Sequence, residues 1–220
     1  RLQITDGMRK ATATSQRYFI SLKGKTLCSV KCIPTDGVFC IEDIIQTQKL
    51  FKGFSFSDAP TILGLYHSDS GSTFIVEEAV PHQTTLYDKV NSGDLLPVNA
   101  AEILENIYQE LITQQSEDHD TDLLTREVGE FFIAAESLSI PGDLIEQLRD
   151  MLKKNLHHLA GRVLRTTRDL ITRNILLTKS KPFVVDFDLS RRTHFLWLDV
   201  YRTNYYSSPV AINQNQLSFI

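Results

Sequence analysis

Three polar residues in the last third of the sequence, Asp169, Asn174 and Asp186, could together act on a phosphate group. Asp169 directly follows Arg168, and an apolar run follows Asn174. A short Thr/Lys/Ser turn leads to a second apolar run that ends in Asp-Phe-Asp, with Asp186 twelve residues beyond Asn174. The two runs predict a hairpin whose ends present an acid, an amide and a second acid at one point.

This set of groups suits the transfer of a phosphoryl group to a hydroxyl. A carboxylate orients the attacking hydroxyl and takes its proton, which is the role we expect for Asp169. An amide oxygen and a carboxylate are ligands that Mg²⁺ accepts, the role we expect for Asn174 and Asp186. The alternative is a hairpin in which Asp and Asn only shape the turns. The spacing Asp-x4-Asn carries little weight by itself, since Asp94 and Asn99 repeat it.

The elements that must position these residues change character along the chain. The first part is rich in β-branched and aromatic residues between turn signals, and it predicts strands at 2–5, 17–22, 26–33, 61–66 and 72–77. Apolar residues at helical spacing predict helices at 41–51, 100–112, 123–135 and 144–159. The sequence therefore predicts an α+β protein, with an antiparallel sheet in an N-terminal lobe (1–80) and a helical C-terminal lobe (81–220) that contains the hairpin.

Composition and charge exclude some classes of function. The 220 residues are 42% hydrophobic and carry a net charge of −4, so there is no basic field and we expect no nucleic-acid partner. No apolar run approaches the length of a membrane span, and the N-terminus lacks a signal-peptide pattern. Cys28 and Cys32 lie in an apolar run, which predicts buried thiols in a reducing compartment. We therefore expect a cytoplasmic protein without a membrane span.

The hairpin resembles the catalytic and metal-binding loops of the protein-kinase-like superfamily, which read His-Arg-Asp-x4-Asn and Asp-Phe-Gly. It is most similar to the aminoglycoside-phosphotransferase branch and its bacterial sugar kinases, with stretches such as His-Arg-Asp-Phe-His-Ser-Arg-Asn-Leu and Ile-Asp-Phe-Gln-Asp. Residues 13–19 resemble the Ala-Ser-x-Arg-Arg-Tyr-Phe element of that branch, and residues 198–200 resemble its Tyr-Asp-Leu element. The resemblance covers residues 11–206 approximately and implies a protein-kinase-like, two-lobed fold.

The resemblance also implies an activity: ATP- and Mg²⁺-dependent phosphotransfer to a hydroxyl of a small molecule, with a sugar or sugar derivative as the expected acceptor. It implies that Lys31 contacts the α- and β-phosphates, although an edge-strand lysine with a buried stem would look the same. Glu42 is the nearest helix carboxylate that could pair with Lys31, but a Glu in the first turn is equally expected from the helix dipole. Glu78 and Val80 lie in the linker whose backbone groups hydrogen-bond adenine.

Three positions depart from the family pattern. Thr167 stands where the family has His, Asp188 stands where it has Gly, and the phosphate loop has only Gly7 near it. The family continues well beyond the metal loop, so the chain fits either an abbreviated acceptor region or part of a longer multidomain protein. These departures leave open a catalytically impaired, kinase-like binding or regulatory module. A protein kinase is a weaker alternative, because no Ala-Pro-Glu element follows the metal loop.

Overall fold

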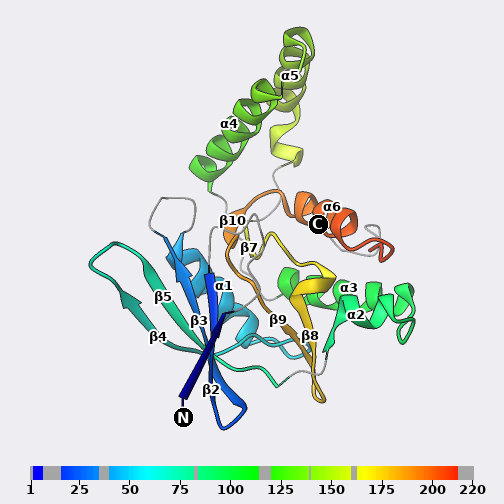
Figure 1. Ribbon diagram of the computed structural model, residues 1–220. Helices are drawn as coiled ribbons and strands as arrows, with labels where there is room; N and C mark the ends of the chain where they lie inside the picture. The colour runs from blue at the N-terminus through cyan, green and yellow to red at the C-terminus, as the bar shows by residue number, and fades with distance from the viewer. Residues whose placement is uncertain are drawn as a thin grey trace.

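A computed structural model describes residues 2–6, 16–34, 40–81, 84–113, 120–138, 140–159 and 163–212. Strands dominate the N-terminal part of the described chain and helices dominate the C-terminal part (Figure 1). The expected α+β architecture is therefore confirmed, while the boundary near residue 80 stays a prediction. The predicted phosphate loop at 11–15 and Gly7 lie outside the described residues.

The N-terminal sheet is antiparallel and has the strand order β1-β2-β3-β5-β4. Its strands are β1 (Leu2–Asp6), β2 (Gln16–Leu22), β3 (Lys25–Ile33), β4 (Ile62–His67) and β5 (Thr73–Glu78). Lys23 and Gly24 both have positive φ, which is the geometry of a two-residue hairpin turn between β2 and β3. Lys31 pairs with Arg17 on one side and Ile75 on the other, so it lies on a central strand of the sheet.

Helix α1 (Ile41–Lys52) packs on one face of this sheet. Its residues Ile44 and Phe51 are buried in the same core as Ile33 and Ile75. Acidic residues in its first turn and lysines in its last turn complement the helix dipole. The two cysteines of β3 lie on the opposite face and are only half-buried, so the prediction of buried thiols was wrong for both. The alternation of a β-strand explains this, because Ser29, Lys31 and Ile33 take the buried face.

The C-terminal part contains five helices among the described residues: α2 (Leu86–Asn91), α3 (Pro97–Thr113), α4 (Thr121–Ser137), α5 (Gly142–Leu159) and α6 (Leu196–Tyr206). The predicted hairpin is present, since β8 (Ile175–Leu177) pairs with β9 (Pro182–Val184) and the two-residue β6 (Thr84–Thr85) pairs with β8. A second small pair joins β7 (Leu164–Thr166) and β10 (Arg191–Thr193). A single 3₁₀ turn, η1 (Thr172–Asn174), precedes β8. These small sheets frame the segment that contains Asp169, Asn174 and Asp186.

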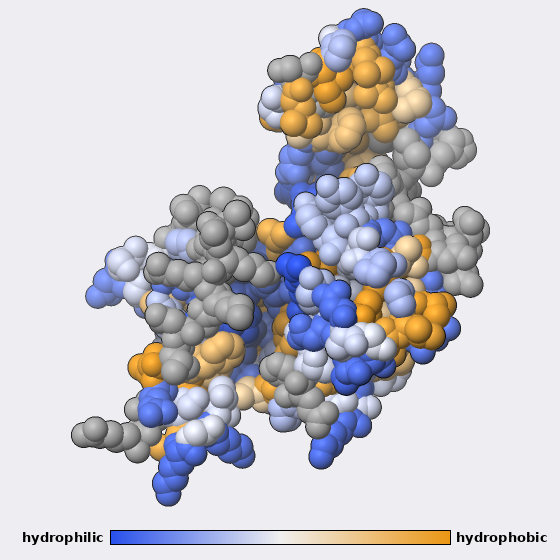
Figure 2. Space-filling view, turned by 45° about the vertical axis from the view of Figure 1, so that its right-hand side comes forward, coloured by the Kyte–Doolittle hydropathy of each residue, from blue (hydrophilic) through white to orange (hydrophobic). Residues whose placement is uncertain are grey.

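Helices α4 and α5 form an arm that projects from the rest of the molecule (Figure 1). Apolar side chains gather on this arm and form the orange patch at the top of Figure 2. The large exposed apolar residues of the arm are Phe131, Ile133, Leu138, Leu144 and Met151. A search of the described helices finds none with the length and apolar character needed to cross a membrane.

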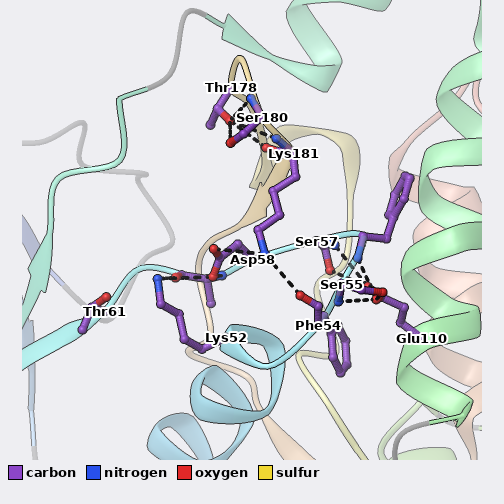
Figure 3. A network of polar contacts seen from close by, with 12 residues as sticks. Lys52, Phe54, Ser55, Ser57, Asp58, Thr61, Glu110, Thr178, Ser180 and Lys181 are labelled. Atoms are coloured by element: carbon purple, nitrogen blue, oxygen red, sulfur yellow. Dashed lines mark hydrogen bonds and ion pairs between the residues drawn. The ribbon is translucent and has the colours of Figure 1, made fainter.

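A polar network joins the end of α1 to the C-terminal part of the fold (Figure 3). The Glu110 carboxylate on α3 accepts hydrogen bonds from the backbone N–H groups of Ser55, Phe56 and Ser57, at 2.6, 2.7 and 3.1 Å. Asp58 pairs with both Lys52 and Lys181, each at 3.3 Å. Because the loop after α1 is held from both α3 and the β8–β9 turn, the network fixes the sheet with α1 against the helices.

Replacing Glu110 with Gln should destabilise the protein by about 2 kcal/mol, because the amide brings N–H groups toward donors that need an acceptor. Burial alone would raise the pKa of Glu110, but the hydrogen bonds from the Phe56 and Ser55 region outweigh it and lower the pKa. The stabilisation should therefore be present above pH 4.5 and be lost as the pH falls through the lowered pKa. Urea unfolding of the variant and of the exposed α3 control Glu102→Gln, at pH 7 and pH 3.5, would measure both effects. Equal stability of the two variants at pH 7 would contradict this assignment.

Candidate active site

Two side chains from different elements hold Asp169 in the loop 166–174, which the sequence predicts to be the catalytic loop and which is called so below. The Asn174 amide donates from Nδ2 to the backbone oxygen and to Oδ2 of Asp169, both at 2.9 Å. Arg202 on α6 approaches Asp169 Oδ1 at 3.4 Å. Asp169 is 16% exposed at its side chain, so the carboxylate is oriented yet still reachable. A carboxylate fixed in this way can accept a hydrogen bond from an incoming hydroxyl and take up its proton.

The metal loop brings two carboxylates to Lys31. Lys31 Nζ lies 2.9 Å from Asp186 Oδ1 and also forms an ion pair with Asp188 Oδ1. The Lys31 side chain is only 4% exposed, so its ammonium depends on these carboxylates as counter-charges. The backbone N–H of Val185 donates to the backbone oxygen of Asn174 at 2.9 Å, which ties the start of the metal loop to the catalytic loop. The structure thus brings Lys31, Asn174, Asp169 and Asp186 into one region, as the sequence predicted, and their roles stay predictions.

Both loops contain a non-glycine residue in the left-handed backbone region. Asp186 has φ 68° and Arg168 has φ 54°. Such conformations are uncommon for residues with a Cβ and cost of order 1 kcal/mol or more, so they persist where surrounding contacts fix them. Asp tolerates this region better than most residues, because its short side chain can bond locally. In this conformation the side chain of Asp186 pairs with Lys31.

Glu42 does not join this group, and the proposed pairing with Lys31 is corrected. Its exposed side chain accepts a hydrogen bond from Gln46 one turn along α1, at 3.0 Å. Thr47 and Gln48 are the buried polar residues of α1, and the Gln48 amide donates to Pro60 O at 2.8 Å and to Glu77 Oε1 at 3.1 Å. The cause is helical phase, since Glu42 at the start of α1 points to solvent. Glu42 therefore fits the alternative role of complementing the helix dipole.

Glu78 and Val80 follow the central part of the sheet, at and just beyond the end of β5. The backbone N–H of Glu78 donates to Thr61 O at 2.9 Å, and its side chain accepts from the Thr61 N–H at 2.9 Å and pairs with Lys52 at 3.2 Å. Val80 is half-buried. The side chain of Glu78 thus fixes the end of the sheet, and the part expected for these residues in binding adenine stays a prediction.

A buried carboxylate on α6 bonds to the start of the catalytic loop. Asp199 accepts a hydrogen bond from the Thr166 hydroxyl and lies 3.8 Å from Arg168 Nε. The Thr166 hydroxyl accepts in turn from the Arg168 N–H at 2.8 Å, and the Thr167 hydroxyl accepts from the Asp169 N–H at 3.2 Å. Thr167, which stands where the resembled family has His, therefore supplies a hydrogen bond to the loop. Asp199 and these threonines thus hold the backbone of the loop that contains Asp169.

Asp199 should make the stability of the protein depend on pH. Burial raises its pKa from 3.8 to about 7, against the attraction of Arg168, Arg191 and Arg202. Because the folded pKa is the higher one, folding favours the protonated form, and this group costs stability progressively as the pH rises from 3.8 to about 7. The Asp199→Asn variant cannot ionise, so its stability relative to the wild type should rise over that interval. Thermal unfolding of both proteins from pH 4.5 to pH 8 would test this, and a constant difference would contradict it.

The oxygen atoms around the metal loop fit Mg²⁺. Asn174 uses Nδ2 to bond Asp169, so its amide oxygen is the atom left for a cation. Asp186 is 29% exposed at its side chain, which leaves it reachable by an ion. No cluster of three or more His, Cys, Asp or Glu side chains suited to a metal occurs within the described ranges. Mg²⁺ does not need one, because it binds through one or two carboxylates plus water and phosphate oxygens.

A pocket of about 490 Å³ adjoins the catalytic loop on the side of the α4–α5 arm. Arg168, the neighbour of Asp169, lines one wall, and α4 and α5 supply apolar walls through Phe131 and Met151. Glu127 and Arg191 line it as well and pair with each other at 3.6 Å. The pocket has the size of a small-molecule site.

Sequence reasoning missed Arg202, and it named Asp199 and Asp188 without the contacts that the structure gives them. Arg202 contacts Asp169, Asp199 supports Thr166, and Asp188 pairs with Lys31. Arg202 and Asp199 come from α6, about thirty residues beyond the loop that they contact, so local periodicity does not predict either contact. Asp188 carried a signal, because it replaces a family glycine next to a metal ligand.

No protein-family model matches the sequence, and no curated protein matches it. Solved structures do match its fold. A thermostable mutant of aminoglycoside phosphotransferase APH(4)-Ia, in the apo form, superposes with a TM-score of 0.63 at 9% identity, over 97% of this chain and 76% of that one. The same enzyme in a ternary complex with AMP-PNP and hygromycin B gives 0.63 at 9% identity, over 97% and 75%. A choline/ethanolamine kinase family protein from Mesorhizobium loti gives 0.59 at 12% identity, over 95% and 65%. The chain therefore has the protein-kinase-like, two-lobed fold of these phosphotransferases, as its sequence predicted.

Proposed function

We propose that this protein transfers the γ-phosphoryl group of ATP, with Mg²⁺, to a hydroxyl group of a small molecule. The observation that supports it most is the ion pair of Lys31 with Asp186, next to the hydrogen-bonded Asp169 and Asn174, within a kinase-like fold. Each of these residues has the chemistry that phosphoryl transfer needs, and the Val185–Asn174 backbone bond links the two groups.

In this proposal Asp169 orients the acceptor hydroxyl and receives its proton as the oxygen attacks. Arg202 and Asn174 keep the Asp169 carboxylate in one orientation, so that little reorganisation is needed during the reaction. Lys31 balances negative charge on the phosphates with its ammonium. The Asn174 amide oxygen and Asp186 would hold Mg²⁺, which neutralises charge on the triphosphate when bound.

The acceptor is proposed only as a class. The solved neighbours include an enzyme in complex with hygromycin B and a choline/ethanolamine kinase family protein, which take chemically different acceptors. The pocket beside Arg168 combines apolar walls with paired charges, so it suits a polar molecule that also has an apolar face. A sugar or sugar derivative remains our preferred acceptor.

A kinase-like module that binds nucleotide without catalysis is the second candidate. One observation favours it: Lys31 already pairs with both carboxylates of the metal loop, so its ammonium is engaged before any ligand enters. The intact set of Asp169, Asn174 and Asp186 opposes it, because a module that only binds has no use for an oriented base.

The test is acceptor-dependent formation of ADP by the purified protein with ATP and Mg²⁺. The panel should contain hygromycin B and other aminoglycosides, choline and ethanolamine, and simple sugars, with Asp169→Asn as the blank. Turnover that requires an acceptor and disappears in the blank would support the enzyme. Stabilisation by nucleotide in thermal unfolding, without turnover on any acceptor, would favour the binding module. Absence of both would contradict the two candidates together.

A further inference from the structure

The buried ammonium of Lys31 finds its counter-charges in an unusual place. Both carboxylates that the structure gives it, Asp186 and Asp188, belong to the metal loop. Helix α1 offers it none: Glu42 bonds to Gln46, Asp43 pairs with Arg165, and the buried polar residues of the helix, Thr47 and Gln48, are uncharged. A lysine that is only 4% exposed needs a charged partner at all times, because an unpaired charge in the interior is costly.

The two carboxylates are not equivalent. The Asp186 side chain is 29% exposed, whereas that of Asp188 is 13% exposed. Asp186 is therefore the one that an entering cation reaches, and the proposed function assigns it to Mg²⁺. When Asp186 turns to the metal, Asp188 is the partner that remains for Lys31.

We infer that Asp188 is the positioning residue for Lys31, so that the phosphate-binding lysine is anchored to the metal loop and not to helix α1. This inference rests on the proposed function for the role of Lys31 in phosphate binding, but the contact between Lys31 and Asp188 exists without any ligand. It follows that movements of α1 should leave the lysine in place, whereas movements of the metal loop should displace it. The competing role for Asp188 is that of a second metal ligand.

A double-mutant cycle on unfolding tests the anchor in the absence of nucleotide and metal. Lys31→Met, Asp188→Asn and the double variant are unfolded with urea in EDTA, beside a matched cycle of Lys31→Met with Glu42→Gln. If Asp188 holds the lysine, Lys31→Met leaves the buried Asp188 carboxylate without its counter-charge, and Asp188→Asn leaves the ammonium with Asp186 alone. The double variant removes both charges of the Lys31–Asp188 pair. The factor by which Lys31→Met changes the unfolding constant should then differ at least tenfold between the wild-type and Asp188→Asn backgrounds. Between the wild-type and Glu42→Gln backgrounds it should differ less than twofold.

Additive behaviour of the Asp188 cycle would overturn the anchor. If Asp188→Asn alone does not fold, recovery of a cooperative transition on adding Lys31→Met would support it, and failure to recover would count against it. A second readout is the rate at which the Lys31 amine is acetylated, followed by mass spectrometry of the folded proteins. We expect this rate to rise severalfold in Asp188→Asn and to stay unchanged in Glu42→Gln.

The outcome is separable from that of the proposed function. If Asp188 anchors Lys31, the coupling should appear even in a protein without phosphotransferase activity. If the enzyme is active but the cycle is additive, only the inference about Asp188 is wrong. A metal-ligand role for Asp188 predicts additivity in EDTA together with a raised Mg²⁺ requirement for nucleotide binding, and that result would replace our inference.

Discussion

Replacing Asp169 with Asn should lower kcat by about 10²–10⁴-fold, the range that a positioned acid–base group contributes. The Asn side chain can still accept the hydrogen bond from Asn174, so the loop should keep its shape. It cannot take the proton of the attacking hydroxyl. Asp169 contacts Asn174 and Arg202, whereas Lys31 contacts Asp186. The Kd of the Mg²⁺–ATP complex should therefore change by less than about threefold, well under the loss of one hydrogen bond to a charged group.

Steady-state kinetics with the acceptor found in the panel, together with calorimetric titration of nucleotide, would measure both quantities. Asp94→Asn is the matched control, since Asp94 has the same spacing to Asn99 and forms an exposed ion pair with Lys89 at 3.0 Å. The control should keep full activity. A loss of nucleotide affinity as large as the loss of kcat would mean that Asp169 binds the nucleotide and is not the base.

The hairpin was predictable because its information is local. A strand, a tight turn and a second strand lie within one short segment, and the pairing of Ile175 with Val184 follows from the turn length. The same holds for the β2–β3 hairpin and for α1, whose observed bounds of Ile41–Lys52 differ from the predicted 41–51 by one residue. Local periodicity and turn chemistry predicted the elements that contain Lys31 and Asp186, and the family resemblance linked the two residues to one site.

The elements that the sequence did not predict are either short or held by distant partners. Helix α2 is only six residues long and is defined by a capping box of Thr85 and Asp88, which a search for apolar periodicity does not detect. Helix α6 contains three tyrosines and bonds the catalytic loop through Thr203, whose hydroxyl donates to Leu170 O at 2.8 Å. Such contacts depend on the tertiary structure, which brings residues far apart in the sequence together.

The partner of Lys31 is the clearest example. Glu42 was the nearest helix carboxylate in sequence, but helical phase turned it to solvent, while Asp188 is 157 residues away from Lys31 along the chain. A residue that departs from a family pattern next to a metal ligand is thus a better candidate for a compensating contact than the nearest residue of the right charge. Asp188 stands where the family has Gly, and α1 provides no carboxylate for Lys31. One explanation covers both: the partner of the lysine lies on the metal loop instead of on the helix.

Replacing Asp186 with Ala should remove the dependence of nucleotide binding on Mg²⁺. Mutation of residues that only support metal ligands costs about 10–100-fold in metal affinity, so loss of a ligand should reach the upper end of that range. Without metal the affinity for ATP should fall little, because Lys31 keeps its ion pair with Asp188. The ratio of the Kd for ATP in EDTA to the Kd in Mg²⁺ should therefore approach one in the variant.

Titration of the nucleotide in Mg²⁺ and in EDTA, for the wild type, Asp186→Ala and Asp188→Asn, would measure this ratio. Asp188→Asn is the informative comparison, because it lies two residues along the same loop and should retain the wild-type ratio if its carboxylate serves Lys31. A ratio that stays at the wild-type value in Asp186→Ala would remove Asp186 from the metal site. If the ratio instead approaches one in Asp188→Asn and stays at the wild-type value in Asp186→Ala, the two assignments exchange. Asp188 would then be the metal ligand and Asp186 the partner of Lys31.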